Sequence, residues 1–112
     1  MNTPTTRSLK LLRDEGYTVA VTEHWNAFAN CRVDLFGFID LVAIREDSPG
    51  VLGVQTTSVS NISARVEKIF SNPITKIWLK AGNRLEVHGW GKHGARGKRK
   101  LWDLTRRPLT LT

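Results

Sequence analysis

Two aspartates interrupt an apolar stretch near the middle of the chain and are its best candidates for chemistry. Asp34 and Asp40 lie in a segment, residues 33–44, where most other side chains are apolar. A buried carboxylate without a partner is costly, so such a carboxylate usually coordinates something, and a divalent metal is the simplest candidate. On a regular strand both aspartates would share one face. Gly37 allows a bend that would remove Asp34 from that face, and Asp34 could equally lie in a turn or pair with an arginine.

Polar side chains end the next apolar run, at Gln55, Thr56 and Thr57. Residues 46–50 are strong turn formers, so the two runs are expected to pair as a hairpin. Gln55 and Thr57 share a face of the second strand, and the hairpin could bring both close to Asp40. Carboxylate, amide and carbonyl oxygens are the donors that Mg²⁺ and similar hard cations prefer. We therefore expect Mg²⁺ or Mn²⁺ to bind at Asp40, Gln55 and Thr56.

The surrounding pattern predicts the elements that position these residues. Thr3 is a candidate N-cap and Pro4 a first helical residue, and Gly16 would end this helix. Strands are predicted over residues 17–25, 33–44 and 51–58, and helices over about 60–70 and 73–81. Two further strands follow, over residues 84–90 and 100–109. The order α-β-β-β-α-α-β-β predicts an α/β domain over residues 1–112, with a central mixed sheet flanked by helices.

Composition narrows the class of protein. The chain has 112 residues, of which 40% are apolar and 24% charged, as in ordinary globular domains. No apolar run approaches the roughly 20 residues of a membrane span, and the first residues do not resemble a secretory signal. The single cysteine, Cys31, cannot form an intrachain disulfide. We therefore expect a cytoplasmic protein without membrane partners.

The two polar motifs resemble the metal site of the PD-(D/E)XK nuclease superfamily over residues 17–70, about half of the chain. Ile39-Asp40 stands where the superfamily has Pro-Asp, and Gln55-Thr56-Thr57 stands where it has (Asp/Glu)-x-Lys. The segments 34–40 and 88–92 are similar to a small phage-borne branch, close in size to Holliday-junction resolvases. The resemblance implies a restriction-endonuclease-like fold, in which carboxylates hold the Mg²⁺ that activates water for phosphodiester hydrolysis. It also implies an origin in a phage or mobile element.

This chain departs from that pattern at two positions. Gln55 can ligate a metal but carries no charge, and Thr57 cannot supply the cation of the missing lysine. Arg65 and Lys68, on the following helix, could supply that charge instead. The residues expected to act in catalysis are Asp40, Gln55, Thr57, Arg65 and Lys68.

The resemblance also implies a further acidic metal ligand, because many members of the superfamily have a glutamate in the first helix. Glu15 lies at the end of that helix here, and Glu23 is better placed, although Glu23 could also be a solvent-facing strand residue. The expected metal ligands are Asp40, Gln55, Thr56, Glu23 and Asp34.

Charge is divided unevenly along the chain. Of 17 basic and 10 acidic residues, residues 71–112 hold 10 basic and 2 acidic ones, which leaves net +8 there and net −1 in residues 1–70. A glycine-rich basic loop is predicted over residues 91–99. Such a segment favours a polyanion partner, although it could be a solvated tail. The expected nucleic-acid contacts are Lys92, His93, Arg96, Lys98, Arg99 and Lys100, with Trp90 as a candidate for base stacking.

Taken together, these patterns predict a metal-dependent DNA endonuclease acting on branched or otherwise structured DNA. One alternative is a catalytically weakened member that only binds DNA, which the missing lysine favours. Another is a small basic RNA-binding protein without a metal site, which would leave Asp40 in an apolar strand unexplained. Whether the protein forms a homodimer is left open by the sequence.

Overall fold

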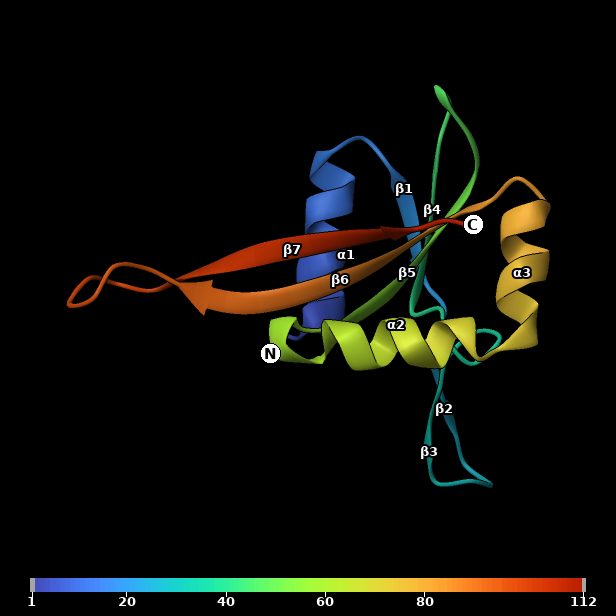
Figure 1. Cartoon of the computed structure of the whole chain (residues 1–112), viewed down its shortest axis with the longest axis horizontal. Coiled ribbons are helices and arrows are strands. Elements are labelled where there is room, and N and C mark those ends of the chain that lie inside the picture. The colour runs from blue at the N-terminus through green and yellow to red at the C-terminus, as the bar shows by residue number, and fades with distance from the viewer. Residues whose placement is uncertain (1, 112) are drawn as a thin grey trace.

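A five-stranded mixed sheet forms the centre of the computed structural model, which describes residues 2–111 (Figure 1). The strands lie in the order β1 (Thr18–Val21), β4 (Leu41–Arg45), β5 (Ser48–Ser58), β6 (Arg84–His93) and β7 (Leu101–Leu109). β5 and β6 are parallel, and the other neighbours are antiparallel. This confirms the predicted α/β class with a mixed central sheet and flanking helices.

Helices cover both faces of the sheet. α1 (Pro4–Asp14) packs on one face, and α2 (Ile62–Phe70) and α3 (Pro73–Lys80) pack on the other, after a short 3₁₀ turn, η1 (Val59–Asn61). The buried core under α1 consists of Leu12, Val19, Leu41, Ala43, Leu52 and Val54. The buried core under α2 and α3 consists of Phe38, Ile39, Ile62, Ile69, Leu85, Val87 and Leu109. Among the described residues, no helix is long and apolar enough to span a membrane.

The predicted N-cap at Thr3 is confirmed, and Asn72 caps the helix predicted over residues 73–81. The Thr3 hydroxyl accepts a hydrogen bond from the Thr6 backbone N–H at 3.2 Å, and the Thr6 hydroxyl accepts one from the Thr3 N–H at 2.7 Å. Asn72 Oδ1 accepts from the Ile74 N–H at 2.9 Å. Each cap pairs N–H groups that the first helical turn leaves without a backbone partner.

The predicted strand over residues 17–25 is wrong, because the chain leaves the sheet after Val21. Its second half, β2 (His24–Asn26), pairs instead with β3 (Cys31–Val33) in a separate two-stranded ribbon. Residues 26–32, which separate the two predicted strands, thus contain the turn and part of both ribbon strands.

The predicted strand over residues 33–44 is also wrong, and with it the argument that alternation places Asp34 and Asp40 on one face. The chain turns sharply between β3 and β4, where Phe36 has φ 56° and Gly37 has φ 87°. This left-handed conformation suits glycine, which has no Cβ to clash with the backbone. Leu35 and Ile39 close the turn through mutual backbone hydrogen bonds. The bend that Gly37 allows is therefore present, and residues 2–111 form two more strands than predicted.

The β6–β7 hairpin extends beyond the body as an arm (Figure 1). β6 continues to His93, three residues further than predicted, so the connecting loop is residues 94–100. β5 likewise begins three residues early, at Ser48. Gly89 lets the start of α2 approach β6, because a Cβ at this position would collide with the Ile62 side chain and lie 3.0 Å from the Val59 Cα.

Candidate metal centre

Three carboxylates meet at one end of the sheet. Glu23 lies between β1 and β2, Asp34 directly follows β3, and Asp40 directly precedes β4. One oxygen of each lies within 4.8 Å of the others, and Asp40 is only 3% exposed. Backbone hydrogen bonds hold Asp40 in place, since its N–H donates to the Val54 carbonyl and its carbonyl accepts from the Thr22 N–H, both at 2.8 Å. This group of carboxylates could hold a metal ion.

β5 supplies the hydrogen-bond donors to Asp40. Asp40 Oδ2 accepts hydrogen bonds from Gln55 Nε2 at 2.8 Å, from the Thr56 N–H at 2.7 Å and from the Thr56 hydroxyl at 3.1 Å. Leu41 pairs with Val54, so Asp40 lies beside Gln55 one step further along the same ladder. The Thr56 N–H and hydroxyl thus orient Asp40, and the role of Thr56 as a metal ligand stays a prediction.

Asp40 resists ionisation in this environment. Burial, followed by the hydrogen bond and the charge of the neighbouring Asp34 carboxyl, raises the pKa of Asp40 to about 7, although the Thr56 and Gln55 donors act in the opposite direction. Near neutral pH the Asp40 carboxyl therefore carries a proton for part of the time. A cation in this place would remove the penalty, because it favours the charged form.

Gln55 has an unpaired acceptor at the centre. Its side chain is buried, and its Nε2 donates to Asp40 Oδ2 at 2.8 Å and reaches Asp34 Oδ2 at 3.5 Å. Its Oε1 is buried and has no hydrogen-bond partner among the described residues. Rotating the amide by 180° would set Oε1 against the Asp40 carboxylate, so the present orientation is the favourable one. An orphaned buried acceptor costs about 1–3 kcal/mol. A cation between the carboxylates would favour the rotated amide, which turns Oε1 toward the ion and Nε2 away from it.

An open, mostly polar hollow of about 340 Å³ gives access to the carboxylates. Its lining comprises Pro4, Thr5, Glu23, Asp34, Asp40, Gln55, Thr56, Thr57, Ser58 and Arg65. Sequence reasoning missed Thr5, whose hydroxyl lies 2.8 Å from the Thr56 hydroxyl. Since the Thr56 hydroxyl donates to Asp40, the Thr5 hydroxyl donates to Thr56. No local pattern marks Thr5, because only the packing of α1 on β5 brings these residues together.

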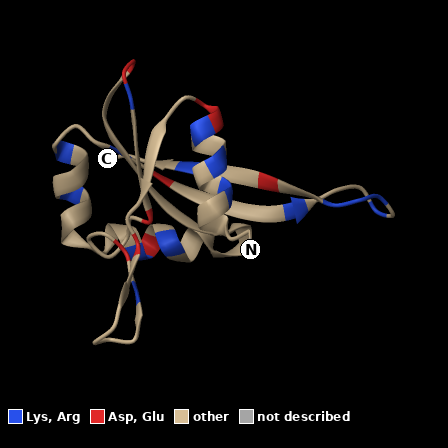
Figure 2. Ribbon diagram, turned by 180° about the vertical axis from the view of Figure 1, so that it is seen from behind, with Lys and Arg blue, Asp and Glu red and all other residues tan. Residues whose placement is uncertain are grey.

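The structure separates the two candidate cations on α2. Arg65 is half-buried and lines the hollow, whereas Lys68 is exposed and is not part of the lining. Figure 2 shows acidic and basic segments side by side where the β2–β3 ribbon joins the body. Thr57 also lines the hollow. Glu15 lies elsewhere and pairs with Arg106 at 2.7 Å.

The basic residues expected to contact nucleic acid lie on the arm, where Figure 2 shows a concentration of Lys and Arg. All six are exposed, namely Lys92, His93, Arg96, Lys98, Arg99 and Lys100. The expectation that Trp90 stacks on bases is wrong, because Trp90 is only 8% exposed and its Nε1 donates to Ser8 Oγ at 2.9 Å. The exposed indole of the arm is Trp102, and the Arg7 guanidinium lies 3.8 Å from its ring centre.

A serine, a histidine and a glutamate form a second polar cluster, which sequence reasoning missed. Ser8 Oγ lies 2.8 Å from His88 Nδ1, and His88 Nε2 lies 2.9 Å from Glu86 Oε1. These are the residue types of a hydrolytic triad, but Ser8 and His88 are both 0% exposed, so no substrate can reach the hydroxyl. Burial acts to raise the pKa of Glu86, yet His88 and Arg106 hold it below its usual value. The cluster ties α1 to β6.

Searches of protein-family models, curated proteins and solved structures found no match to this chain. The chemistry of the centre therefore rests on its own geometry: three carboxylates, one unpaired amide oxygen and one guanidinium around an open polar hollow.

Proposed function

We propose that this protein is a Mg²⁺- or Mn²⁺-dependent DNA endonuclease with the restriction-endonuclease-like fold of the PD-(D/E)XK superfamily. The observation that carries the proposal is the convergence of Glu23, Asp34 and Asp40 beside the buried side chain of Gln55. Three carboxylates this close repel one another unless a proton or a cation lies between them.

The donor set fits a hard divalent cation. Carboxylates and an amide carbonyl are all oxygen donors, which suit Mg²⁺ and Mn²⁺, and the centre has none of the thiolate or imidazole ligands typical of zinc. Asp40, Asp34, Glu23 and Gln55 Oε1 would hold the ion. The hollow is open, so space for water and a substrate phosphate adjoins the carboxylates.

The chain's own residues support hydrolysis at this place. A bound Mg²⁺ supplies positive charge to a phosphate oxygen and lowers the pKa of a coordinated water. β5 orients Asp40 through three hydrogen bonds, which fixes the ligand geometry before substrate arrives. Arg65 brings a positive charge to the wall of the hollow, where it can stabilise charge that develops on the phosphate.

The basic arm supports a nucleic-acid substrate. Its six exposed basic side chains extend beyond a body that carries the acidic centre, so a polyanion can bind the arm while one phosphate reaches the hollow. An RNA-binding protein without a metal site would leave the carboxylate cluster without a role.

A catalytically weakened DNA-binding protein is the second candidate function. Thr57 favours it, because this residue lines the hollow and carries no charge where the superfamily has a catalytic lysine. Gln55 likewise removes one negative charge from the ligand set.

A cleavage panel separates these candidates. Labelled duplex, single-stranded and branched DNA, and a matching RNA, are incubated with the protein in Mg²⁺, Mn²⁺ or EDTA. We expect metal-dependent cleavage of DNA that Asp40→Ala lowers by at least about 10²-fold. Asp14→Ala, which removes an exposed carboxylate on α1, is the matched control and should leave the rate unchanged. DNA binding without cleavage in either metal would favour the weakened member, and cleavage that survives Asp40→Ala would contradict the proposal.

A further inference from the structure

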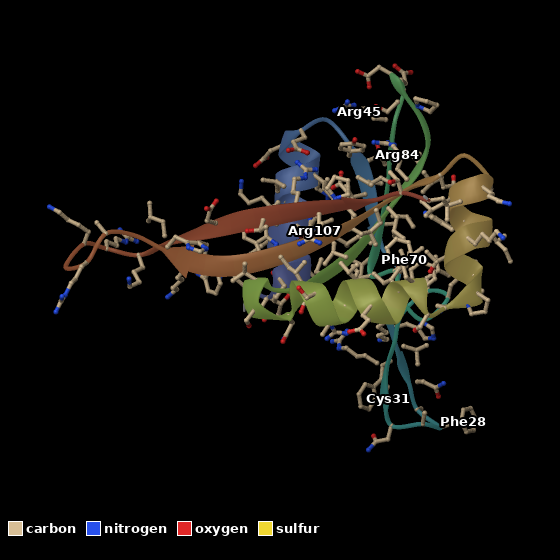
Figure 3. The ribbon with its side chains drawn as sticks, viewed as in Figure 1. Phe28, Cys31, Arg45, Phe70, Arg84 and Arg107 are labelled. Atoms are coloured by element: carbon tan, nitrogen blue, oxygen red, sulfur yellow. The ribbon has the colours of Figure 1, made fainter. Side chains whose placement is uncertain are left out.

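The β2–β3 ribbon projects from the body and carries two exposed aromatic rings (Figures 1 and 3). Trp25 is 58% exposed, and Phe28, at the far end of the ribbon, is fully exposed. Neither ring contributes to the two cores of the protein. Exposed aromatic rings on a projecting element are typical of a binding surface rather than of a folding requirement.

The tip of the ribbon is an ordered turn. Asn26 Oδ1 accepts hydrogen bonds from the Phe28 N–H at 3.0 Å and from the Ala29 N–H at 3.1 Å. Asn30 takes the left-handed conformation, with φ 53°, that asparagine tolerates better than most residues. The turn thus presents Phe28 to solvent in a fixed place.

Both strands of the ribbon begin at the metal centre. Glu23 directly precedes β2 and Asp34 directly follows β3, so two of the three carboxylates lie at its base. At about 3.4 Å per residue, Trp25 lies within roughly 7 Å of Glu23 along the chain, and Phe28 within roughly 17 Å. A base next to a phosphate held at the carboxylates would therefore be within reach of these rings.

One face of the ribbon combines an aromatic ring with a cation. Trp25 is directly opposite Arg32 in the ladder, so both side chains project from the same face. Arg32 is 67% exposed at its side chain and lies 3.7 Å from the Glu23 carboxylate. A ring for a base and a guanidinium for a phosphate are the two groups with which proteins bind unpaired nucleotides.

We propose that the β2–β3 ribbon stacks on unpaired bases next to the scissile phosphate, so that the substrate is DNA with a single-stranded segment at a duplex junction. This inference rests on the proposed function and names its substrate class. In a continuous duplex each base face is covered by its neighbours, so the rings find a partner only where bases are unstacked.

A second copy of this chain fits the ribbon less well. Two aromatic side chains bury about 150–250 Å² each, whereas a stable interface needs about 800 Å² per partner. The exposed charge of Arg32 beside Trp25 also favours a polyanion over an apolar dimer surface.

The test measures binding of the full chain to two DNAs in EDTA, where metal-dependent cleavage does not occur. One DNA is a duplex with a single-stranded extension that carries 2-aminopurine at the first unpaired position, and the other is the fully paired duplex of the same sequence. We expect tighter binding to the junction, with a change in 2-aminopurine fluorescence. Phe28→Ala and Trp25→Ala should each weaken junction binding by roughly 5- to 100-fold and leave duplex binding unchanged. Phe28→Tyr should retain the preference and Phe28→Leu should lose it, because stacking needs a π face.

Ile77→Ala is the matched control, since Ile77 is 67% exposed on α3, and it should change neither affinity. The proposal is overturned if the wild-type protein shows no junction preference, if Phe28→Leu binds like wild type, or if Phe28→Ala only converts a dimer to a monomer in gel filtration. Failure of the cleavage panel would leave this binding result standing. Equal binding to both DNAs would contradict the proposed role of the ribbon, but it would not contradict metal-dependent cleavage.

Discussion

Asp40 and Gln55 form the pair on which the centre is built. The Gln55 amide lies between two carboxylates and donates to Asp40 at 2.8 Å, so it offsets repulsion that a glutamate at this position would increase. Its other end, Oε1, is left without a partner among the described residues. An uncharged residue at this position is thus compatible with a proposed ligand set that already has three carboxylates.

The role of the missing motif lysine can be tested at Thr57. If Arg65 supplies the positive charge, Arg65→Ala should slow single-turnover cleavage by on the order of 10²-fold, because a cation near the scissile phosphate is lost. Thr57→Lys should do little in the wild-type protein and should restore much of the rate in the Arg65→Ala variant. Gln55→Glu combined with Thr57→Lys rebuilds the superfamily pattern and should cleave at least as fast as wild type.

Lys68→Ala is the matched control, because Lys68 lies on the same helix and outside the hollow. A larger loss of rate in Lys68→Ala than in Arg65→Ala would contradict the placement of the charge. If none of these changes alters cleavage while Asp40→Ala abolishes it, the second half of the site lies elsewhere in the chain.

Part of this residue-level arrangement follows from the sequence. Alternation on β5, together with a hairpin to β4, is enough to bring Asp40, Gln55 and Thr57 close to one another. Asp34 reaches the centre through a sharp turn rather than through a regular strand. Thr5 lies 51 residues from Thr56, so only tertiary packing reveals its hydrogen bond.

At the scale of elements, the helices were predictable and the strand breaks were not. The caps at Thr3 and Asn72 are local signals that act within a few residues. Residues 17–25 are rich in β-forming residues throughout, so no local signal marks the point where the chain leaves the sheet. The pairing of β1 with β4 ends where the Thr22 and Glu23 N–H groups both donate to the Asp40 carbonyl, a contact between segments far apart in the sequence.

The buried cluster of Ser8 and His88 should stabilise the contact of α1 with β6. Ser8→Ala should lower the free energy of unfolding by about 1–3 kcal/mol, because it leaves the Trp90 N–H and a ring nitrogen of His88 buried without partners. Urea unfolding followed by circular dichroism measures this change. Ser63→Ala, at an exposed position of α2, should stay within about 0.5 kcal/mol of wild type. Equal stability of the two variants would show that the cluster contributes nothing.

The arm should dominate the salt dependence of DNA binding. Replacing Lys98, Arg99 and Lys100 by alanine should weaken binding and reduce the slope of log affinity against log salt by up to about 2.7, at about 0.9 per phosphate contact. Fluorescence anisotropy at several salt concentrations gives both values. The double variant Lys76→Ala, Lys80→Ala on α3 is the control and should keep the wild-type slope. An unchanged slope in the arm variant would mean that the segment is only a solvated tail.

At the scale of the whole molecule, the acidic centre, the basic arm and the aromatic ribbon lie in different places. The acidic centre lies in the body, the basic residues extend along the arm, and the aromatic ribbon leaves the body at the centre (Figures 1 and 2). One polyanionic chain could therefore contact the arm, the centre and the ribbon together.

The stability of the metal-free protein should fall as pH rises from about 5 to 8. The pKa of Asp40 is raised from 3.8 to about 7, so the folded state binds more protons than the unfolded state between these values, and the stability that protonation gives is lost as pH rises through 7. Between pH 5 and 8 the loss is at most about 3 kcal/mol, because about two pH units separate pH 5 from the folded-state pKa, at about 1.36 kcal/mol per unit. The lowered pKa of Glu86 acts in the opposite direction and only below its ordinary value of 4.5.

Urea unfolding at several pH values, in EDTA, measures this effect as the difference between wild type and Asp40→Asn. The asparagine keeps the size of the side chain and cannot titrate. The contributions of the other titrating groups to the pH dependence of stability therefore cancel in the difference. A difference that stays constant from pH 5 to 8 would contradict the raised pKa.

The central claim is that the Asp40 cluster binds a divalent metal ion, and direct titration with Mn²⁺ tests it. Electron paramagnetic resonance of free Mn²⁺ gives the number of bound ions and their affinity, independently of any cleavage. We expect wild type and the control Asp14→Asn to bind Mn²⁺ at this centre, with competition by Mg²⁺, and Asp40→Asn to weaken binding by at least about 10-fold, or 1.4 kcal/mol. Wild-type affinity in the Asp40→Asn variant, or no binding by the wild-type protein, would contradict the account.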